Sequence, residues 1–133
     1  LVRSRGLGDV YKRQAPGGKH MRVVKKGTDY CIKLSDEPAI DGLRPCANVM
    51  YESLENCQYD EITCVVLTGM GADGTKGIQG LAAHHKKLHV IAQDADTCVV
   101  YGMPKAIAQT GLVDEVVPLG SVAETITKNV GVS

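Results

Sequence analysis

The stretch Cys64-Val-Val-Leu-Thr-Gly-Met-Gly-Ala-Asp-Gly-Thr75 joins a short apolar run to a glycine-rich loop that carries one carboxylate, Asp73. The run from Cys64 to Leu67 is continuous and rich in valine, which is typical of a strand buried on both faces of a parallel sheet. Glycines at 69, 71 and 74 permit a sharp turn, because only glycine takes positive φ at no steric cost. Residues 75–83 predict a helix, so the stretch places Asp73 at the carboxyl edge of an α/β sheet.

Further elements extend outward from this stretch on both sides. Upstream, residues 21–25 and 30–34 predict a β-hairpin, whose alternation buries Tyr30, Ile32 and Leu34 on one face. Apolar residues between 46 and 57 recur at helical spacing after Pro45. Downstream, the sequence predicts strands at 88–92 and 113–118, a helix starting at Met103 and ending near Gly111, and a last helix at 122–130 opened by a Ser121–Glu124 capping box. Strands that alternate with helices indicate parallel βα units, and hence a doubly wound α/β fold with a small antiparallel hairpin.

The composition sets limits on the class of protein. The chain has 133 residues, of which 44% are hydrophobic, so it can form one domain with a real core, and with no Phe or Trp that core is aliphatic. Five cysteines are widely spaced without a CxxC pair, and we interpret them as reduced thiols of a cytoplasmic protein. The sequence suggests no metal site or cofactor, and it holds no apolar run long enough to insert into a membrane.

Residues 1–14 differ from the rest of the chain. They hold four basic residues against Asp9, a local charge of +3, while the formal net charge of the whole chain is zero. They show no clear periodicity, and patterned sequence begins at Ala15. We interpret residues 1–14 as a non-native or disordered segment and residues 15–133 as the domain, although a natural basic tail or a strand is the alternative. Outside this short end there is no basic surface for nucleic acid.

Two kinds of chemistry fit the glycine-rich loop. Gly69-Met-Gly-Ala-Asp-Gly74 has the spacing of a dinucleotide-binding fingerprint, and Asp94 follows the next strand, where it would bind a ribose. Against this, Asp73 would put a negative charge where the pyrophosphate binds. The second possibility uses the carboxylate itself, because a fixed, ionised aspartate orients the histidine of a serine hydrolase. Taken alone, Asp73 can also be simply a helix cap.

Five blocks of sequence favour the second possibility. They are Ala15-Pro-Gly-Gly-Lys-His-Met21, Arg44-Pro45, Leu67-Thr-Gly-Met-Gly-Ala-Asp-Gly74, Ile91-Ala-Gln-Asp94 and Val100-Tyr-Gly-Met-Pro104. In this order they resemble the catalytic domain of the chemotaxis protein-glutamate methylesterases, over residues 15 to 130. The resemblance implies a doubly wound serine hydrolase that removes methyl groups from glutamates of chemoreceptors and deamidates certain glutamines. A nucleotide-binding module and a non-catalytic receptor-binding relative are the alternatives.

The resemblance also implies roles for single residues. Asp73 corresponds to the acid of the Ser-His-Asp triad, whereas the blocks that hold the serine and the histidine precede the Pro-Gly-Gly block and have no counterpart here. The chain therefore resembles the carboxyl-terminal part of the domain, and we expect it to be inactive alone. The N–H groups of Met70 and Gly71 are candidates for oxyanion stabilisation, although they can equally serve only to shape the turn.

Two further residues are candidates on the substrate side of the site. Arg44 is placed to guide an acidic receptor surface, and His20 is a candidate for the active-site rim, its alternative being a hairpin residue. The partners implied by the resemblance are the cytoplasmic helices of methylated chemoreceptors and, in the parent protein, an upstream receiver domain.

Overall fold

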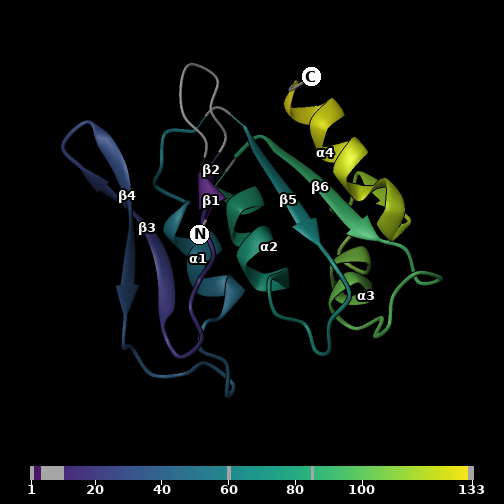
Figure 1. The fold of residues 1–133 in the computed structure, drawn as a ribbon, viewed down its shortest axis with the longest axis horizontal. Helices are drawn as coiled ribbons and strands as arrows, with labels where there is room; N and C mark the ends of the chain where they lie inside the picture. The colour runs from purple at the N-terminus through teal and green to yellow at the C-terminus, as the bar shows by residue number, and fades with distance from the viewer. Residues whose placement is uncertain (1, 4–10, 60, 85, 132–133) are drawn as a thin grey trace.

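The computed structural model describes residues 2–3, 11–59, 61–84 and 86–131. A three-stranded parallel sheet lies at the centre, with helices on both of its faces (Figure 1). The elements are, in chain order, β1 (Val2–Arg3), β2 (Tyr11–Lys12), β3 (His20–Lys26), β4 (Asp29–Ser35), α1 (Ala47–Ser53), β5 (Ile62–Val66), α2 (Thr75–Ala83), β6 (Leu88–Gln93), α3 (Met103–Ala108), β7 (Glu115–Val117), a 3-10 turn (Leu119–Ser121) and α4 (Val122–Val130). The predicted α/β class with a separate antiparallel hairpin is confirmed.

The central sheet has the order β5-β6-β7, and both pairings are parallel. Strands β5 and β6 start in register at Ile62 and Leu88, so both end at the same edge, where their arrowheads point in Figure 1. The glycine-rich loop leaves β5 at this edge. It is therefore on the side where ligands bind in open parallel sheets.

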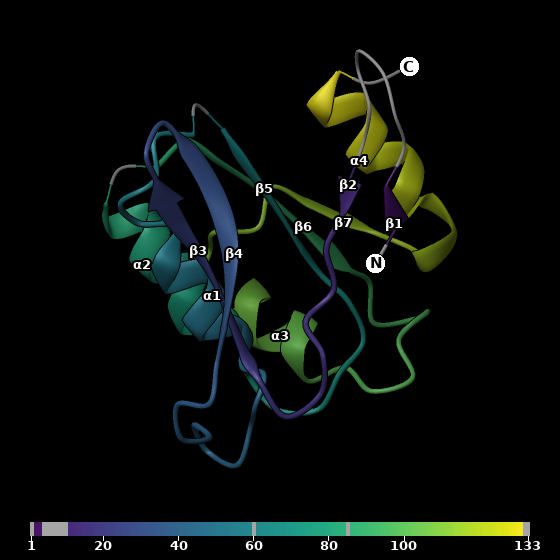
Figure 2. The ribbon, with the colours of Figure 1, turned by 60° about the vertical axis from the view of Figure 1, so that its left-hand side comes forward.

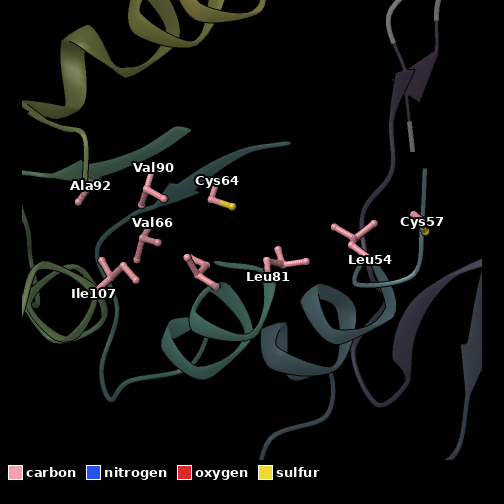
Figure 3. Close-up of a cluster of buried hydrophobic side chains, with 9 residues drawn as sticks. Leu54, Cys57, Cys64, Val66, Leu81, Val90, Ala92 and Ile107 are labelled. Carbon is pink, nitrogen blue, oxygen red and sulfur yellow. The ribbon is translucent and has the colours of Figure 1, made fainter. Parts of the chain in front are cut away.

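The core lies between the sheet and helices α2 and α3. Figure 3 shows Val66 of β5 and Ala92 of β6 directed toward the layer that holds Leu81 of α2 and Ile107 of α3. Leu81 and Ile107 are completely buried, and apart from Cys57 and Cys64 the buried cluster is aliphatic, as the composition predicts. Helix α4 lies on the opposite face of the sheet (Figures 1 and 2). The hairpin of β3 and β4 lies on the side of α1 and α2, with these two helices between it and the sheet.

Two sequence predictions in these elements are wrong. The hairpin forms as predicted, but Ile32 is 38% and Leu34 is 46% exposed, because α1 packs along β3 and leaves much of β4 uncovered. The last helix has the predicted bounds, but the Ser121 side chain caps no amide. Ser121 ends a 3-10 turn with ψ −2°, and this is not the extended backbone that aims an N-cap hydroxyl at the first helical turn.

The short amino-terminal strands β1 and β2 pair with each other in antiparallel register. Residues 1 and 4–10 of the segment interpreted as non-native lie outside the described residues. None of the helices in the described part of the chain has the length and apolar character needed to cross a membrane.

Candidate active site

The glycine-rich loop is held against the loop that precedes α3. Gly69 N–H donates to the carbonyl of Val100 at 3.0 Å, and the N–H groups of Gly102 and Met103 donate to the Gly69 carbonyl at 3.1 and 2.8 Å. A Cβ atom on Gly102 would lie 2.6 Å from that same oxygen, so a side chain at 102 would push the two loops apart. Because of this close approach, the Gly102-Met-Pro104 block lies directly against the glycine-rich loop.

Within the loop, Gly71 and Gly74 have φ angles of 86° and 95°, which favour glycine, as predicted. Gly69 has no positive φ. A Cβ on Gly69 would lie 2.6 Å from the Met103 sulfur, so a side chain at 69 would displace that of Met103. The loop thereby turns away from β5 and presents the side chain of Asp73 toward α1.

The carboxylate of Asp73 binds the amino-terminal end of α1 and not that of its own helix, α2. Its Oδ2 accepts a hydrogen bond from Ala47 N–H at 2.7 Å, and its Oδ1 accepts one from Asn48 N–H at 3.1 Å. The Cys46 thiol also donates to Oδ1, at 3.1 Å. These three donors fix the position of the carboxylate against the start of α1. Asp73 takes part in none of the ion pairs found among the described residues.

The amino-terminal amides of α2 are bound in return by α1. Asn48 Oδ1 accepts hydrogen bonds from Gly74 N–H at 3.0 Å and from Gly77 N–H at 2.9 Å. Each helix therefore caps the start of the other. Sequence reasoning missed Asn48 and Cys46, because they lie more than 20 residues from Asp73 and only the tertiary packing brings them together.

His20, a candidate for the active-site rim, is 1% exposed at the start of β3. Its Nδ1 accepts a hydrogen bond from Cys46 N–H at 3.3 Å, and its Nε2 lies 2.9 Å from the Pro38 carbonyl. A neutral ring with the proton on Nε2 satisfies both contacts. Both ring nitrogens are thus engaged, and His20 supports the start of α1 from the hairpin.

The other candidate residues lie in exposed positions. The Met70 side chain is 86% exposed, and no hydrogen bond between described residues engages the N–H of Met70 or Gly71. Arg44 is exposed on the loop after β4, where its guanidinium donates to the carbonyls of Asp36 and Glu37 at 3.3 Å.

Two hollows meet at Asp73. The smaller, of about 270 Å³, is lined by apolar side chains and the carboxylate: Ala15, Met21, Pro45, Cys46, Ala47, Met50 and Asp73. The larger, a groove of about 600 Å³, runs between the loop after β4 and the start of α2, past Ile40, Leu43 and Met70. The buried hydroxyl of Thr75, which also lines this groove, has no hydrogen-bond partner among the residues that the structure describes. Asp73 can therefore be approached from both sides.

The same contacts weaken the dinucleotide alternative. A pyrophosphate needs free amides at the start of the helix, but Gly74 and Gly77 already donate to Asn48. Asp94, the residue expected to bind a ribose, accepts hydrogen bonds from the N–H and the hydroxyl of Thr97 at 3.0 and 2.6 Å. Among the described residues there is no group of three or more His, Cys, Asp or Glu side chains that could hold a metal ion.

A parallel sheet with a fixed carboxylate at its carboxyl edge, beside open hollows, defines a doubly wound α/β domain with its functional site at the strand ends. The model of the CheB methylesterase family matches residues 8–126, so its range begins inside the segment 1–14. The chain belongs to the CheB methylesterase family.

Individual relatives agree with this assignment. The chain is 43% identical over 118 residues to a protein-glutamate methylesterase/protein-glutamine glutaminase of Desulfotalea psychrophila, covering 87% of this chain and 32% of the relative. A Pseudomonas aeruginosa protein of the same description is 39% identical over 112 residues, with 84% and 32% covered. The crystal structure of the Thermotoga maritima CheB methylesterase catalytic domain superimposes with a TM-score of 0.77 at 31% identity, covering 85% of this chain and 59% of that one. The chain thus spans about a third of the curated relatives it matches.

Proposed function

We propose that this chain supplies the acidic member of a Ser-His-Asp site that hydrolyses glutamate methyl esters, and the amide of certain glutamines, on bacterial chemoreceptors. The observation that carries the proposal is the fixed carboxylate of Asp73. Its Oδ2 accepts one hydrogen bond from the described residues, and a carboxylate oxygen can accept two. The second acceptor position of Oδ2 is available to an imidazole N–H.

The reaction assigned to this site is acyl transfer through a serine. The serine oxygen attacks the ester carbonyl, and a histidine takes the serine proton and passes it to the leaving methanol. Water then hydrolyses the acyl-enzyme with the same histidine as base, leaving a free glutamate. In both steps Asp73 holds the imidazole in the productive tautomer and stabilises the imidazolium.

The serine and the histidine are assigned to the part of the relatives' catalytic domain that this chain does not cover. No described serine or histidine is hydrogen-bonded to Asp73, whose partners are Cys46, Ala47 and Asn48. We therefore expect no turnover from the 133-residue polypeptide alone.

Further roles in the proposal concern the substrate and the partners. Met70 N–H and Gly71 N–H lie on the exposed loop beside Asp73, and we assign them to the oxyanion of the tetrahedral intermediate. Arg44 is assigned to the acidic surface of a receptor. The proposed partners are the cytoplasmic helices of methylated chemoreceptors and an upstream receiver domain in the parent protein, which places the function in the cytoplasm.

The test joins this chain to the part of the Thermotoga maritima domain that has no counterpart here, and measures release of methanol from methylated receptor. We expect the fusion to be active and Asp73→Asn to lower kcat by about 10⁴, since the imidazole loses its orienting acid. The matched control is Asp29→Asn, at the exposed hairpin turn, which should leave kcat unchanged. Full activity of the Asp73→Asn fusion would refute the proposed role of Asp73, and an inactive but folded fusion would favour a non-catalytic relative.

A further inference from the structure

Asn48 connects the two helices that meet at Asp73. It is the second residue of α1, and its side-chain oxygen accepts from Gly74 N–H and Gly77 N–H, which belong to the cap and the first turn of α2. The amide at the third helical position, here Gly77, is normally satisfied by the side chain of the helix's own N-cap residue, and the amide of the N-cap residue by a side chain of the first turn. The N-cap of α2 is Gly74, which has no side chain, so Asn48 satisfies them from the neighbouring helix.

The backbone of Asn48 completes a closed arrangement around Asp73. Asn48 N–H donates to Asp73 Oδ1, while Asn48 Oδ1 accepts from the N–H of the next residue, Gly74. One residue therefore holds both the carboxylate of Asp73 and the peptide that follows it. Rotation of the carboxylate away from α1 is restricted from two directions, and the acceptor position of Oδ2 keeps a fixed direction.

Helices α1 and α2 approach each other closely at Gly77. A Cβ on Gly77 would lie 2.6 Å from the Cβ of Tyr51 and 3.1 Å from the Cα of Asn48. At this separation the carboxamide of Asn48 reaches the amides of α2 directly. The close packing at Gly77 thus sets the distance between α1 and α2, and the hydrogen bonds of Asn48 set the position of the start of one helix relative to the start of the other.

We propose that Asn48 is a positioning residue of the hydrolase site, acting through Asp73. The inference rests on the proposed function, because it gives a catalytic consequence to the hold of Asn48 on the triad acid. Groups that orient a catalytic base must stay within about 0.5 Å of the productive geometry, and a displacement of about 1 Å can cost about a hundredfold in rate. Without the Asn48 carboxamide, Asp73 keeps its hydrogen bonds to the start of α1, but the peptide that follows it loses its hydrogen bond to that helix.

The first part of the test measures the hold on Asp73 in this chain itself. Asn48→Ala removes the acceptor, while Asn48→Asp keeps an oxygen at the same place. The matched control is Ser53→Ala in the same helix, which removes the acceptor of Val23 N–H (2.8 Å), and the Ser53 hydroxyl is hydrogen-bonded to neither Asp73 nor α2 among the described residues. The readouts are the proton chemical shift of the Ala47 amide, which reports its short bond to Asp73, and the hydrogen exchange of Gly74 and Gly77 relative to amides of β6.

We expect Asn48→Ala to accelerate exchange of Gly74 and Gly77 about fivefold to tenfold and to shift the Ala47 amide proton upfield. Asn48→Asp should restore both readouts, and Ser53→Ala should change neither, even where it lowers global stability as much. An Ala47 shift that is the same in Asn48→Ala as in Ser53→Ala would overturn the inference.

The second part measures turnover in the fusion described above. Asn48→Ala should lower kcat about tenfold to a hundredfold with KM nearly unchanged, and Asn48→Asp should recover most of the loss. An unchanged kcat for Asn48→Ala, in a fusion that Asp73→Asn inactivates, would overturn the inference and leave the proposed function intact. If Asp73→Asn itself has no effect, the proposed function fails, and the Ala47 shift still reports whether Asn48 holds Asp73.

Discussion

Asp73 uses its two oxygens to hold two backbone amides, and an asparagine at this position can hold only one of them. In Asp73→Asn the amide nitrogen must face either Ala47 N–H or Asn48 N–H, and that N–H loses its acceptor. We expect a loss of about 1–3 kcal/mol in the free energy of unfolding, measured by urea denaturation. Asp29→Asn, on the exposed hairpin turn, should stay within about 0.5 kcal/mol of the parent chain. Equal urea midpoints for the two variants would show that the hydrogen bonds of Asp73 to the start of α1 do not stabilise the fold.

The cysteines differ in reactivity according to their surroundings. Burial raises the pKa of the Cys64 thiol to about 11, and burial followed by the hydrogen bond to Asp73 raises the pKa of Cys46. Because only the thiolate attacks a disulfide reagent, Cys46, Cys57 and Cys64 should react at mildly alkaline pH only when the chain unfolds. The partly exposed Cys31 and Cys98 should react first, and labelling followed by peptide mass analysis gives the order. Early labelling of Cys46 would show that the start of α1 opens readily.

At the scale of elements, the contact between α1 and α2 depends on a glycine that faces backbone. Gly77→Ala would place its Cβ 2.6 Å from the Tyr51 Cβ, so the helices must separate. We expect this overpacking to lower the free energy of unfolding by about 1–3 kcal/mol despite the better helix propensity of alanine.

Gly80→Ala is the matched control, since it makes the same change in the same helix. Its Cβ would meet only the carboxylate end of Glu55, a flexible side chain that can move. The variant should therefore be as stable as the parent or more stable by up to about 1 kcal/mol. Thermal or urea unfolding of Gly77→Ala and Gly80→Ala tests this prediction. Equal effects on the free energy of unfolding would show that α1 and α2 are not tightly packed at Gly77.

At the scale of the whole molecule, the carboxylates of the exposed Glu37 and the half-buried Glu115 make the stability of the fold dependent on acid. The Arg22 guanidinium and then the Ser35 hydroxyl lower the pKa of Glu37 to about 2, and contacts first with His89 and then with Asn129 lower the pKa of Glu115. A lowered pKa in the folded state stabilises it above the ordinary value near 4.5, and this contribution disappears as the pH falls toward the folded value.

We therefore expect unfolding to become easier between about pH 4.5 and about 2, with Glu37→Gln showing a smaller loss over this range. High salt should reduce the difference, because the Arg22–Glu37 pair is exposed. Urea midpoints measured across this pH range, with and without salt, are the test. An identical pH dependence in Glu37→Gln would show that the pair contributes nothing to stability.

The sequence predicts the elements well where the pattern is local. The helix at 75–83 has the predicted bounds, and the parallel strands lie within about two residues of their predicted places. Patterns cannot show which surfaces meet. Alternation in β4 predicts a buried face, yet α1 covers β3 instead, and an aspartate next to α2 is expected to cap α2, yet it caps α1. Both differences arise from tertiary contacts between residues far apart in the chain.

The reciprocal capping of α1 and α2 has a consequence for biosynthesis. Residues 46–53 emerge from the ribosome before Asp73 does, so the first amides of α1 are without their carboxylate partner until that residue has also left the exit tunnel. Once Asp73 and the start of α2 have emerged, Asp73 accepts from the first amides of α1 and Asn48 accepts from the first amides of α2, so both helix starts are satisfied together. The nascent chain should therefore acquire protease resistance over residues 46–83 in one step, and stalled chains that end before Asp73 clears the exit tunnel should still be cleaved there.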